Sequence, residues 1–245
     1  MKLFIAALLS LLAGLAQANE AVIRKAIAER IPDFPKIDEV RPTPIPGLFE
    51  VRIGLDIFYS DPTGQYLLQD AQMVDLKTRA NLTQARIDQL SQVNFASLPL
   101  KDAMVWKRGN GQRKIAVFSD PNCGFCKRLE RTLQELNNVT VYTFLIPILG
   151  PDSNEKSRNV WCAKDNVNVW LDWMLRAKQP EKLAGKCDES AIQRNRAFAR
   201  QHRITGTPAI LFEDGSRAPG ALDLQALEER LKRAENREGR EAKGG

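Results

Sequence analysis

An apolar run, a turn signal and a helical repeat form the clearest pattern in the chain. Ile115 to Phe118 are all apolar and predict a buried strand. Asp120-Pro121-Asn122 follows and is typical of a turn. Leucines then recur at the spacing of one helix face, at Leu129, Leu133 and Leu136. Residues 115–136 therefore predict a strand, a turn and a helix in succession.

The N-terminal third predicts one helix and a small sheet. Residues 20–31 carry apolar positions near helical spacing and predict a short amphipathic helix. Prolines then argue against regular structure, at Pro32, Pro35, Pro42, Pro44 and Pro46. Alternating apolar residues predict one long strand over residues 48–59, which a turn at Asp61–Gly64 connects to a strand at Gln65–Leu68. Gln72–Leu76 is expected to complete this sheet.

A linker helix is predicted next. Thr83 is a candidate N-cap for a helix over Gln84–Leu90, whose apolar stripe is narrow. Leu98-Pro99 is expected to end this helix, and a domain boundary is expected near residue 100.

The C-terminal part alternates strands and helices. Strands are predicted at Met104–Trp106 and Val139–Ile146, and the latter should run parallel to the strand at 115–118 through a right-handed crossover. Residues 152–203 are expected to be mostly helical.

Two strands and a helix are predicted near the C-terminus. Ala209–Phe212 is expected to turn at Glu213-Asp214-Gly215 and return through Ser216–Pro219. Leu222–Leu231 predicts a final helix. Arg233–Gly245 is charged and ends in glycine, so it is expected to be disordered.

The first eighteen residues predict a secretory signal peptide. Lys2 supplies the positive start, Leu3–Leu15 is apolar, and Ala16-Gln17-Ala18 is a small-x-small cleavage site. The apolar run is too short to span a membrane, although a retained N-terminal anchor is the alternative. Removal of residues 1–18 would leave a mature chain that starts at Asn19.

Charge and length narrow the function classes. The chain has 245 residues and a net charge of +6, with basic residues scattered over the predicted helices. Basic and aromatic residues are not interleaved, which argues against nucleic-acid binding. The length is sufficient for one large or two small domains.

Two cysteines occupy the start of the predicted helix after residue 122. Backbone N–H groups and the helix dipole stabilise an anion there, and such a setting lowers the pKa of a cysteine. Cys123 is expected to be the exposed attacking thiol, and Cys126 the thiol that resolves the mixed disulfide. A structural disulfide or half of a zinc site are the alternatives. The other cysteines, Cys162 and Cys187, lie too far apart to supply a second close pair for zinc.

Three motifs in this order resemble a known family. Thr205-Gly206-Thr207-Pro208 precedes an apolar strand and resembles the cis-proline loop of the thioredoxin fold. Together with Cys123-Gly124-Phe125-Cys126 and Trp161-Cys162-Ala163-Lys164-Asp165, it resembles the periplasmic disulfide isomerases of the DsbC/DsbG family. The resemblance covers nearly the whole chain, including the signal peptide.

The resemblance implies an α+β fold with an N-terminal dimerisation domain and a thioredoxin-like catalytic domain that contains a helical insertion. The expected boundaries are a signal peptide at 1–18, the dimerisation domain at 19–80, the linker helix at 81–100, the catalytic domain at 101–238 and a flexible tail at 239–245. An exposed strand edge that pairs with a second copy would account for a homodimer. A monomer, whose sheet packs on its own catalytic domain, is the alternative.

The resemblance also assigns site residues. It implies a cis bond before Pro208, so that the backbone of Thr207 faces Cys123 and can pair with an extended client. Gly124 and Phe125, between the cysteines, would set the redox poise, and the Thr207 side chain would tune the thiolate. Because Cys123 and Cys126 form the redox pair, Cys162 and Cys187 are expected to form a structural disulfide.

One feature departs from thioredoxins, which carry a buried aspartate six positions before the first cysteine. Val117 occupies that position, so the proton acceptor for Cys126 is unidentified. Asp120 is nearer, but it is interpreted as a turn residue. His202, the only histidine, is expected on a solvated helix face, and Trp161 in the core around the disulfide.

These observations predict a periplasmic thiol–disulfide isomerase that reshuffles wrong disulfides in secreted proteins, with chaperone activity as an addition. Its implied partners are misoxidised or unfolded proteins and a membrane thiol reductase that supplies electrons. No metal or organic cofactor is indicated. The alternatives are a thiol oxidase or reductase of a narrow client set, and a holdase chaperone with secondary redox chemistry.

Overall fold

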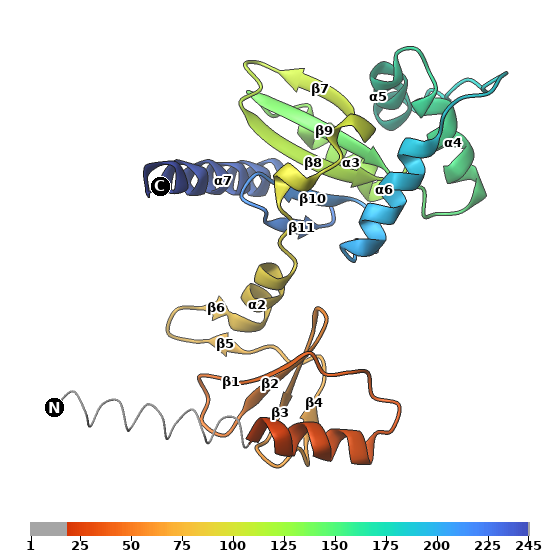
Figure 1. Ribbon diagram of the computed structural model, residues 1–245. Coiled ribbons are helices and arrows are strands. Elements are labelled where there is room, and N and C mark those ends of the chain that lie inside the picture. The colour runs from red at the N-terminus through yellow and green to blue at the C-terminus, as the bar shows by residue number, and fades with distance from the viewer. Residues whose placement is uncertain (1–18, 245) are drawn as a thin grey trace. The chain divides into compact units, whose positions relative to one another are not determined.

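The computed structural model describes residues 19–244, so the predicted signal peptide lies outside the described residues. The chain divides between Leu90 and Ser91 into two compact units, each of which contains helices and a sheet (Figure 1). This mixed architecture agrees with the predicted α+β class. Across residues 19–244, no helix combines the length and apolar character needed to cross a membrane.

The N-terminal unit contains a helix over residues 19–30 and an antiparallel sheet in the order β1-β2-β3-β4. The strands are β1 (Glu39–Pro42), β2 (Phe49–Ile53), β3 (Asp56–Ser60) and β4 (Leu67–Leu68). The predicted helix is therefore confirmed. Its buried Ile23 and Ile27 pack against apolar residues of the sheet, at Val40, Phe49 and Val51.

The prediction of one long strand over residues 48–59 was wrong, because β2 and β3 form a hairpin. Gly54 lies in the turn with φ of 62°, a conformation that glycine adopts without a steric cost. Val51 pairs with Phe58 across the hairpin. The apolar alternation continues through the turn at Leu55, so the pattern alone conceals the reversal.

The prolines do not exclude a strand, contrary to expectation. Strand β1 pairs with β2 from Glu39 to Pro42, with Pro42 opposite Phe49. This strand lies at the edge of its sheet, where proline's missing N–H can face away from the ladder.

The segment Gln72–Leu76 does not join this sheet, which corrects a further prediction. Val74–Asp75 forms β5 and pairs only with β6 (Ala80–Asn81) in a separate two-stranded sheet. Helix α2 (Leu82–Leu90) follows directly. Asn81 accepts a hydrogen bond from the Gln84 N–H at 2.9 Å.

Thr83 is therefore not the helix cap, contrary to the prediction. Its hydroxyl group is buried and contacts the Tyr59 hydroxyl at 2.5 Å. It also accepts a hydrogen bond from the N–H of Met73 at 2.8 Å. Thr83 thus fixes α2 against β3 and the chain before β5.

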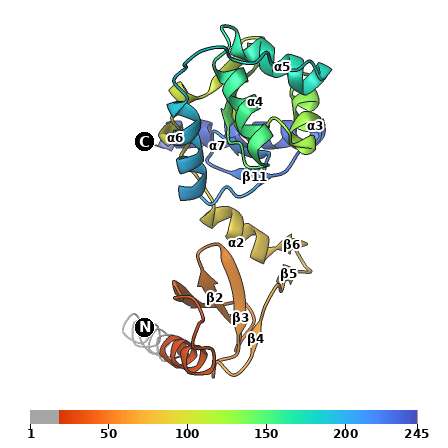
Figure 2. The ribbon, with the colours of Figure 1, turned by 90° about the vertical axis from the view of Figure 1, so that its right-hand side faces the viewer.

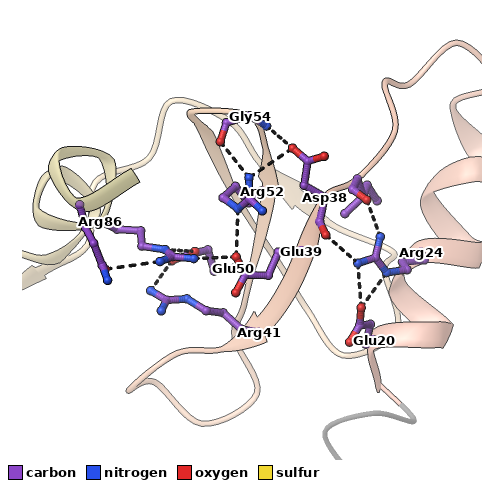
Figure 3. A network of polar contacts seen from close by, with 11 residues as sticks. Glu20, Arg24, Asp38, Glu39, Arg41, Glu50, Arg52, Gly54 and Arg86 are labelled. Atoms are coloured by element: carbon purple, nitrogen blue, oxygen red, sulfur yellow. Dashed lines mark hydrogen bonds and ion pairs between the residues drawn. The ribbon is translucent and has the colours of Figure 1, made fainter. Parts of the chain in front are cut away.

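A network of ion pairs also connects α2 to the sheet (Figure 3). Glu50 on β2 is only 4% exposed and pairs with Arg86 of α2 at 3.1 Å and with Arg41 of β1 at 2.8 Å. Glu39 of β1 pairs with the same Arg86 at 2.6 Å and with Arg52 at 2.9 Å. Arg86 therefore bridges two strands from the helix, and its loss would leave both carboxylates with fewer partners.

The C-terminal unit is built on a five-stranded sheet in the order β11-β10-β8-β9-β7. The strands are β7 (Met104–Arg108), β8 (Arg113–Ser119), β9 (Val139–Leu145), β10 (Ala209–Phe212) and β11 (Arg217–Pro219). Strands β8 and β9 are parallel, which confirms the predicted β-α-β unit. The other pairs are antiparallel.

Five α-helices and two short 3₁₀ turns complete this unit. They are η1 (Phe95–Ser97), η2 (Leu100–Asp102), α3 (Gly124–Leu133), α4 (Pro151–Trp161), α5 (Asn166–Arg176), α6 (Ser190–Gln201) and α7 (Leu224–Gly244). Helices α4, α5 and α6 bear out the mostly helical insertion. Helix α5 packs against both α3 and α4, and the three lie together in Figure 2.

The sheet separates two cores. Ile115 and Val117 of β8 face α3 and α7, together with the predicted leucines Leu129, Leu133 and Leu136, all of which are buried. Ala116 and Phe118 face the opposite side of the sheet, where they pack with Phe144 of β9 and Ala199 of α6. The two-residue period of β8 therefore supplies both cores.

Two helix ends differ from the predictions. The linker helix ends at Leu90 rather than at Leu98-Pro99, because the 3₁₀ turns η1 and η2 occupy the following segment. The C-terminal helix continues to Gly244 rather than ending at Leu231. Residues 233–244, expected to be disordered and to include the flexible tail from 239, belong to this helix, since glutamate, arginine, lysine and alanine favour helix.

Candidate active site

Cys123 is the N-cap residue of α3, directly after the turn that follows β8. Its Sγ atom accepts a hydrogen bond from the N–H of Cys126 at 3.2 Å. N-cap side chains satisfy backbone donors that a helix leaves free at its first turn, and the helix dipole favours negative charge at the same place. The sulfur of Cys123 is therefore held where a thiolate is stabilised.

The pKa of Cys123 is lowered from its usual 9.0 to about 6. The largest cause is a hydrogen bond from the Cys126 thiol, and burial acts in the opposite direction. The Thr207 side chain and the backbone N–H groups of Cys126 and Phe125 lower the pKa further. Cys123 is consequently a thiolate, the nucleophilic form, at neutral pH.

Cys126 lies deeper and has the opposite protonation behaviour. It is 1% exposed, and burial, the largest cause, raises the pKa of its thiol well above the ordinary value. The two cysteines are free in this structure. Cys123 is thus ready to attack as a thiolate, whereas Cys126 is a protonated thiol that donates a hydrogen bond to it.

Cys123 itself is not exposed, which corrects a prediction. It is 5% exposed and belongs to an apolar cluster that contains Trp173. Its Sγ also lies 3.2 Å from the carbonyl oxygen of Thr207. The contact with Thr207 and the place of Cys123 in this cluster leave it less exposed than the pattern at a helix start suggests.

Thr207 and Pro208 are brought to the cysteines from the loop before β10. The peptide bond between them is cis, as expected. This loop and the end of β11 line a pocket, formed mainly by residues 203–209 with Arg217, Pro219 and Gly220. The backbone of Thr207 therefore borders both the sulfur of Cys123 and a depression in the surface.

Phe125 and Gly124 form the outer surface of the Cys-x-x-Cys turn. Phe125 is 60% exposed, and the guanidinium group of Arg128 lies 5.2 Å from the centre of its ring. Open space surrounds Gly124, where an added side chain would meet no atom within 4 Å. The turn thus presents an apolar ring to solvent beside the reactive sulfur.

Asp120 fixes the turn that carries Cys123. Its fully buried carboxylate accepts hydrogen bonds from Asn122 N–H at 2.7 Å and the Ser153 hydroxyl at 2.8 Å. It also accepts from the N–H groups of Ile148 and Leu149, at 2.7 and 3.0 Å. The turn function expected of Asp120 is thereby confirmed, and the carboxylate also holds the loop after β9.

Comparisons with known proteins match both units. Residues 14–84 match the family described as disulfide bond isomerase protein N-terminal domain, and residues 100–235 match the thioredoxin-like domain. The chain is 44% identical over 209 residues to a Bordetella parapertussis protein named "Probable thiol:disulfide interchange protein DsbC", covering 85% of this chain and 73% of the relative. The chain belongs to the DsbC family of disulfide isomerases.

Two further relatives extend this assignment. The DsbC protein of Escherichia coli K12 is 28% identical over 228 residues, covering 91% of this chain and 92% of the relative. A solved disulfide interchange protein from Neisseria gonorrhoeae is 37% identical with a TM-score of 0.52, covering 56% of this chain and 98% of that structure.

The remaining cysteines of this DsbC-family chain form a disulfide. Cys162, at the end of α4, is bonded to Cys187 in the segment before α6, with their Cα atoms 6.0 Å apart. Trp161 beside it is half-buried and donates a hydrogen bond to the carbonyl oxygen of Asp188 at 3.1 Å. The disulfide and the indole together connect the end of α4 to the part of the chain just before α6.

His202 lies at the end of α6. Its ring contacts the Phe198 ring with centroids 4.2 Å apart, so it is half-buried rather than fully solvated as expected. Among the residues that the structure describes, no group of three or more His, Cys, Asp or Glu side chains could hold a metal ion.

Sequence reasoning misses two residues around the site. Trp173 of α5 donates a hydrogen bond to the carbonyl oxygen of Pro121 at 2.6 Å, and Lys127 lies 3.8 Å from the centre of its ring. Glu130 is buried on α3, one turn after Cys126. Nothing in the sequence separates Trp173 from the other tryptophans. Glu130 does have a sequence signal, because it lies four residues after Cys126 and between two leucines of the core.

Proposed function

We propose that this protein reshuffles wrong disulfides in secreted proteins, with Cys123 as the attacking thiol. The observation that carries this proposal is the lowered pKa of a cysteine held 3.2 Å from the cis-proline loop. The thiolate at neutral pH supports nucleophilic attack on a disulfide, and the family assignment supports isomerisation as the outcome.

The reaction follows from the different protonation of the two cysteines. The Cys123 thiolate attacks one sulfur of a client disulfide, so a Cys123–client bond forms and the client's other sulfur leaves as a thiolate. A client thiolate then attacks the mixed disulfide, which returns Cys123 and leaves the client with a new disulfide. If Cys126 attacks instead, the client is released reduced and the enzyme is oxidised.

The surroundings of Cys123 support an extended, unfolded client. The backbone of Thr207 borders the sulfur and can pair with a client strand. Phe125, Ile148 and Leu149 are exposed apolar residues, at 60%, 42% and 54%, and the last two belong to the loop that Asp120 holds. These side chains favour apolar segments, which folded proteins conceal and unfolded ones expose. They also favour the chaperone activity considered as an addition.

We further propose the arrangement in which this chemistry operates. Residues 1–18 direct export to the periplasm and are removed, residues 19–80 mediate a homodimer, and the linker at 81–100 joins them to the catalytic domain at 101–238. Cys162 and Cys187 are structural. Isomerisation needs reduced Cys123, so a membrane thiol reductase is the electron donor that we propose.

A scrambled-disulfide substrate tests the proposal. Reduced mature protein, without added oxidant, is expected to restore the activity of the substrate, and Cys123→Ala is expected to abolish the recovery. Net reduction of the substrate without recovery would favour the reductase, and oxidation of reduced clients alone would favour the oxidase. Full suppression of client aggregation by Cys123→Ala would show chaperone activity that is independent of the cysteine.

A further inference from the structure

A buried glutamate with an unpaired carboxyl oxygen lies one turn after Cys126. Glu130 is 1% exposed, and its Oε1 atom has no hydrogen-bond partner within the part of the chain that the structure describes. A buried carboxyl group of this kind is costly unless it has a function or a partner. The core position would be filled more favourably by a leucine, as at Leu129 and Leu133 on either side.

Helix geometry directs this carboxyl group towards Cys126. Residues at i and i+4 lie on one helix face, with Cβ atoms about 5–6 Å apart. Long helical side chains lean towards the N-terminus of their helix, which here is the direction of Cys126. Cys126 and Glu130 are both buried on α3, so they share an interior environment.

The neighbours of Glu130 place it in the surroundings of the second cysteine. The Trp170 and Trp106 indole N–H groups act on its carboxyl group, and Trp170 belongs to the same apolar cluster as Cys126. The Nε1 atoms of both tryptophans form no hydrogen bond of normal geometry within the described residues. The Glu130 carboxyl group therefore has two uncharged indole donors nearby, while its Oε1 atom lacks a hydrogen-bond partner within the described residues.

Burial, the dominant effect, raises the pKa of Glu130 to about 7, and the two indoles partly oppose it. At neutral pH this carboxyl group can therefore both accept and release a proton. On its own helix, Cys126 lies four residues before it and Lys127 three residues before it. The side chains that act on its pKa from β7 and α5 are uncharged indoles.

We propose that Glu130 accepts the proton of the Cys126 thiol when Cys126 resolves the mixed disulfide at Cys123. The inference rests on the proposed function, because it concerns the second step of that reaction. The Cys126 S–H bond breaks and the proton moves to the Glu130 carboxylate. The Cys126 thiolate then forms a bond to the Cys123 sulfur, the Cys123–client bond breaks, and the client leaves as a thiolate. The cysteine pair is oxidised and the client is reduced, so the step is balanced.

Other candidates for this proton are less suited. The carboxylate of Asp120 already accepts four hydrogen bonds. Val117 occupies the position at which thioredoxins carry an aspartate, and it has no acceptor. Glu130 thus supplies from α3 the group that is missing from β8.

The test separates the two steps with a small disulfide. Reduced protein is mixed with dithiobis(nitrobenzoate), which releases one coloured thiolate when Cys123 attacks and a second when Cys126 resolves the adduct. In Glu130→Gln we expect the first release to be unchanged and the second to be about 100-fold slower at neutral pH. Glu135→Gln, which removes an exposed carboxylate just after the same helix, should change neither release.

The pH profile distinguishes proton transfer from a structural role. In the unchanged protein, the rate of the second release should rise up to about pH 7 and then level off, as Glu130 becomes ionised. In Glu130→Gln the rate should continue to rise with pH, because only hydroxide or solvent removes the proton. Glu130→Asp, which retains a carboxyl group, should recover part of the rate.

Two results would overturn the proposal. One is a rate of the second thiolate release in Glu130→Gln that equals the rate in the unchanged protein, or that falls only by the same factor as the rate of the first release. The other is a rate in the unchanged protein that rises steadily through pH 7 and beyond, a result that does not depend on the folding of any variant. Because the probe is a small disulfide, a failure here differs from a failure to isomerise a protein substrate.

Discussion

The Sγ atom of Cys123 lies 3.2 Å from the carbonyl oxygen of Thr207, although the two residues are 84 positions apart in the chain. This contact brings the start of α3 to the loop before β10. It places the nucleophile beside the backbone that we propose to pair with an extended client. The side chain of Thr207 also lowers the pKa of Cys123, so this residue contributes to thiolate stability.

Thr207→Val should raise the pKa of Cys123 above its value of about 6. Valine matches the shape of threonine but cannot donate a hydrogen bond to the thiolate. The ultraviolet absorbance of the thiolate, followed against pH in reduced protein, measures the midpoint directly. Thr205→Val, in the same loop but without this contact, serves as the control. An unchanged midpoint in Thr207→Val would show that the hydroxyl does not act on the sulfur.

The lowered pKa of Cys123 should make the stability of the reduced protein depend on pH. The folded state favours the thiolate, so the stabilisation is full above the ordinary pKa of 9.0 and is lost as the pH falls to about 6. Denaturant unfolding of reduced protein from pH 6 to 9 should therefore show rising stability relative to Cys123→Ala. Parallel curves for the two proteins would contradict the lowered pKa. The raised pKa of Cys126 acts only above this range.

Asp120→Asn should destabilise the C-terminal unit by about 3 kcal/mol, because an amide cannot accept from all four donors that surround the buried carboxylate. Unfolding by denaturant measures the loss. Asp152 is a matched control, since it also contacts Asn122 but is exposed, and Asp152→Asn should have a much smaller effect. Equal losses in the two variants would refute the special position of Asp120.

Arg86→Met should weaken the attachment of α2 to its sheet, at a cost of about 2 kcal/mol in the N-terminal unit, because buried Glu50 keeps only Arg41 as a partner. Hydrogen exchange should accelerate in α2 and β2 and remain unchanged in the C-terminal unit. Substitution of the exposed Lys77 by methionine provides the comparison. Unaltered exchange in α2 would mean that the ion pairs do not hold the helix.

Replacing Cys162 and Cys187 with alanine should lower stability by about 3 kcal/mol, since the disulfide closes a loop of 25 positions. The attack of Cys123 on dithiobis(nitrobenzoate) should keep its rate, because the step breaks and forms bonds at the Cys123 sulfur and at neither of the replaced cysteines. Loss of that first step in a folded double variant would assign Cys162 or Cys187 a redox role instead.

Local patterns predict the elements that carry the site. The leucines of α3 and the apolar run of β8 are sufficient to place Cys123 and Cys126 at a helix start. The contact to Thr207 is different, because no local pattern relates residues 84 positions apart. Only the resemblance of the motifs to a known family predicts it.

The wrong predictions from the sequence concern features that turns and tertiary contacts determine. Apolar residues alternate with others from Phe49 to Ile57, yet Gly54 permits a reversal that the alternation does not reveal. Thr83 has the chemistry of a cap but forms buried hydrogen bonds to Tyr59 and Met73, while Asn81 caps the helix. Cys123 is buried in a cluster that includes Trp173 and lies against Thr207, and the chain supplies both residues from distant positions.

Trapping of the client intermediate tests the central claim most directly. In the Cys126→Ala variant, Cys123 can attack a client disulfide but has no internal partner to release it. Incubation of the reduced variant with a scrambled-disulfide protein should accumulate a covalent complex, and mass spectrometry should locate the bond at Cys123. A complex joined through Cys162 or Cys187, or no complex under conditions in which the unchanged protein reacts, would contradict the account.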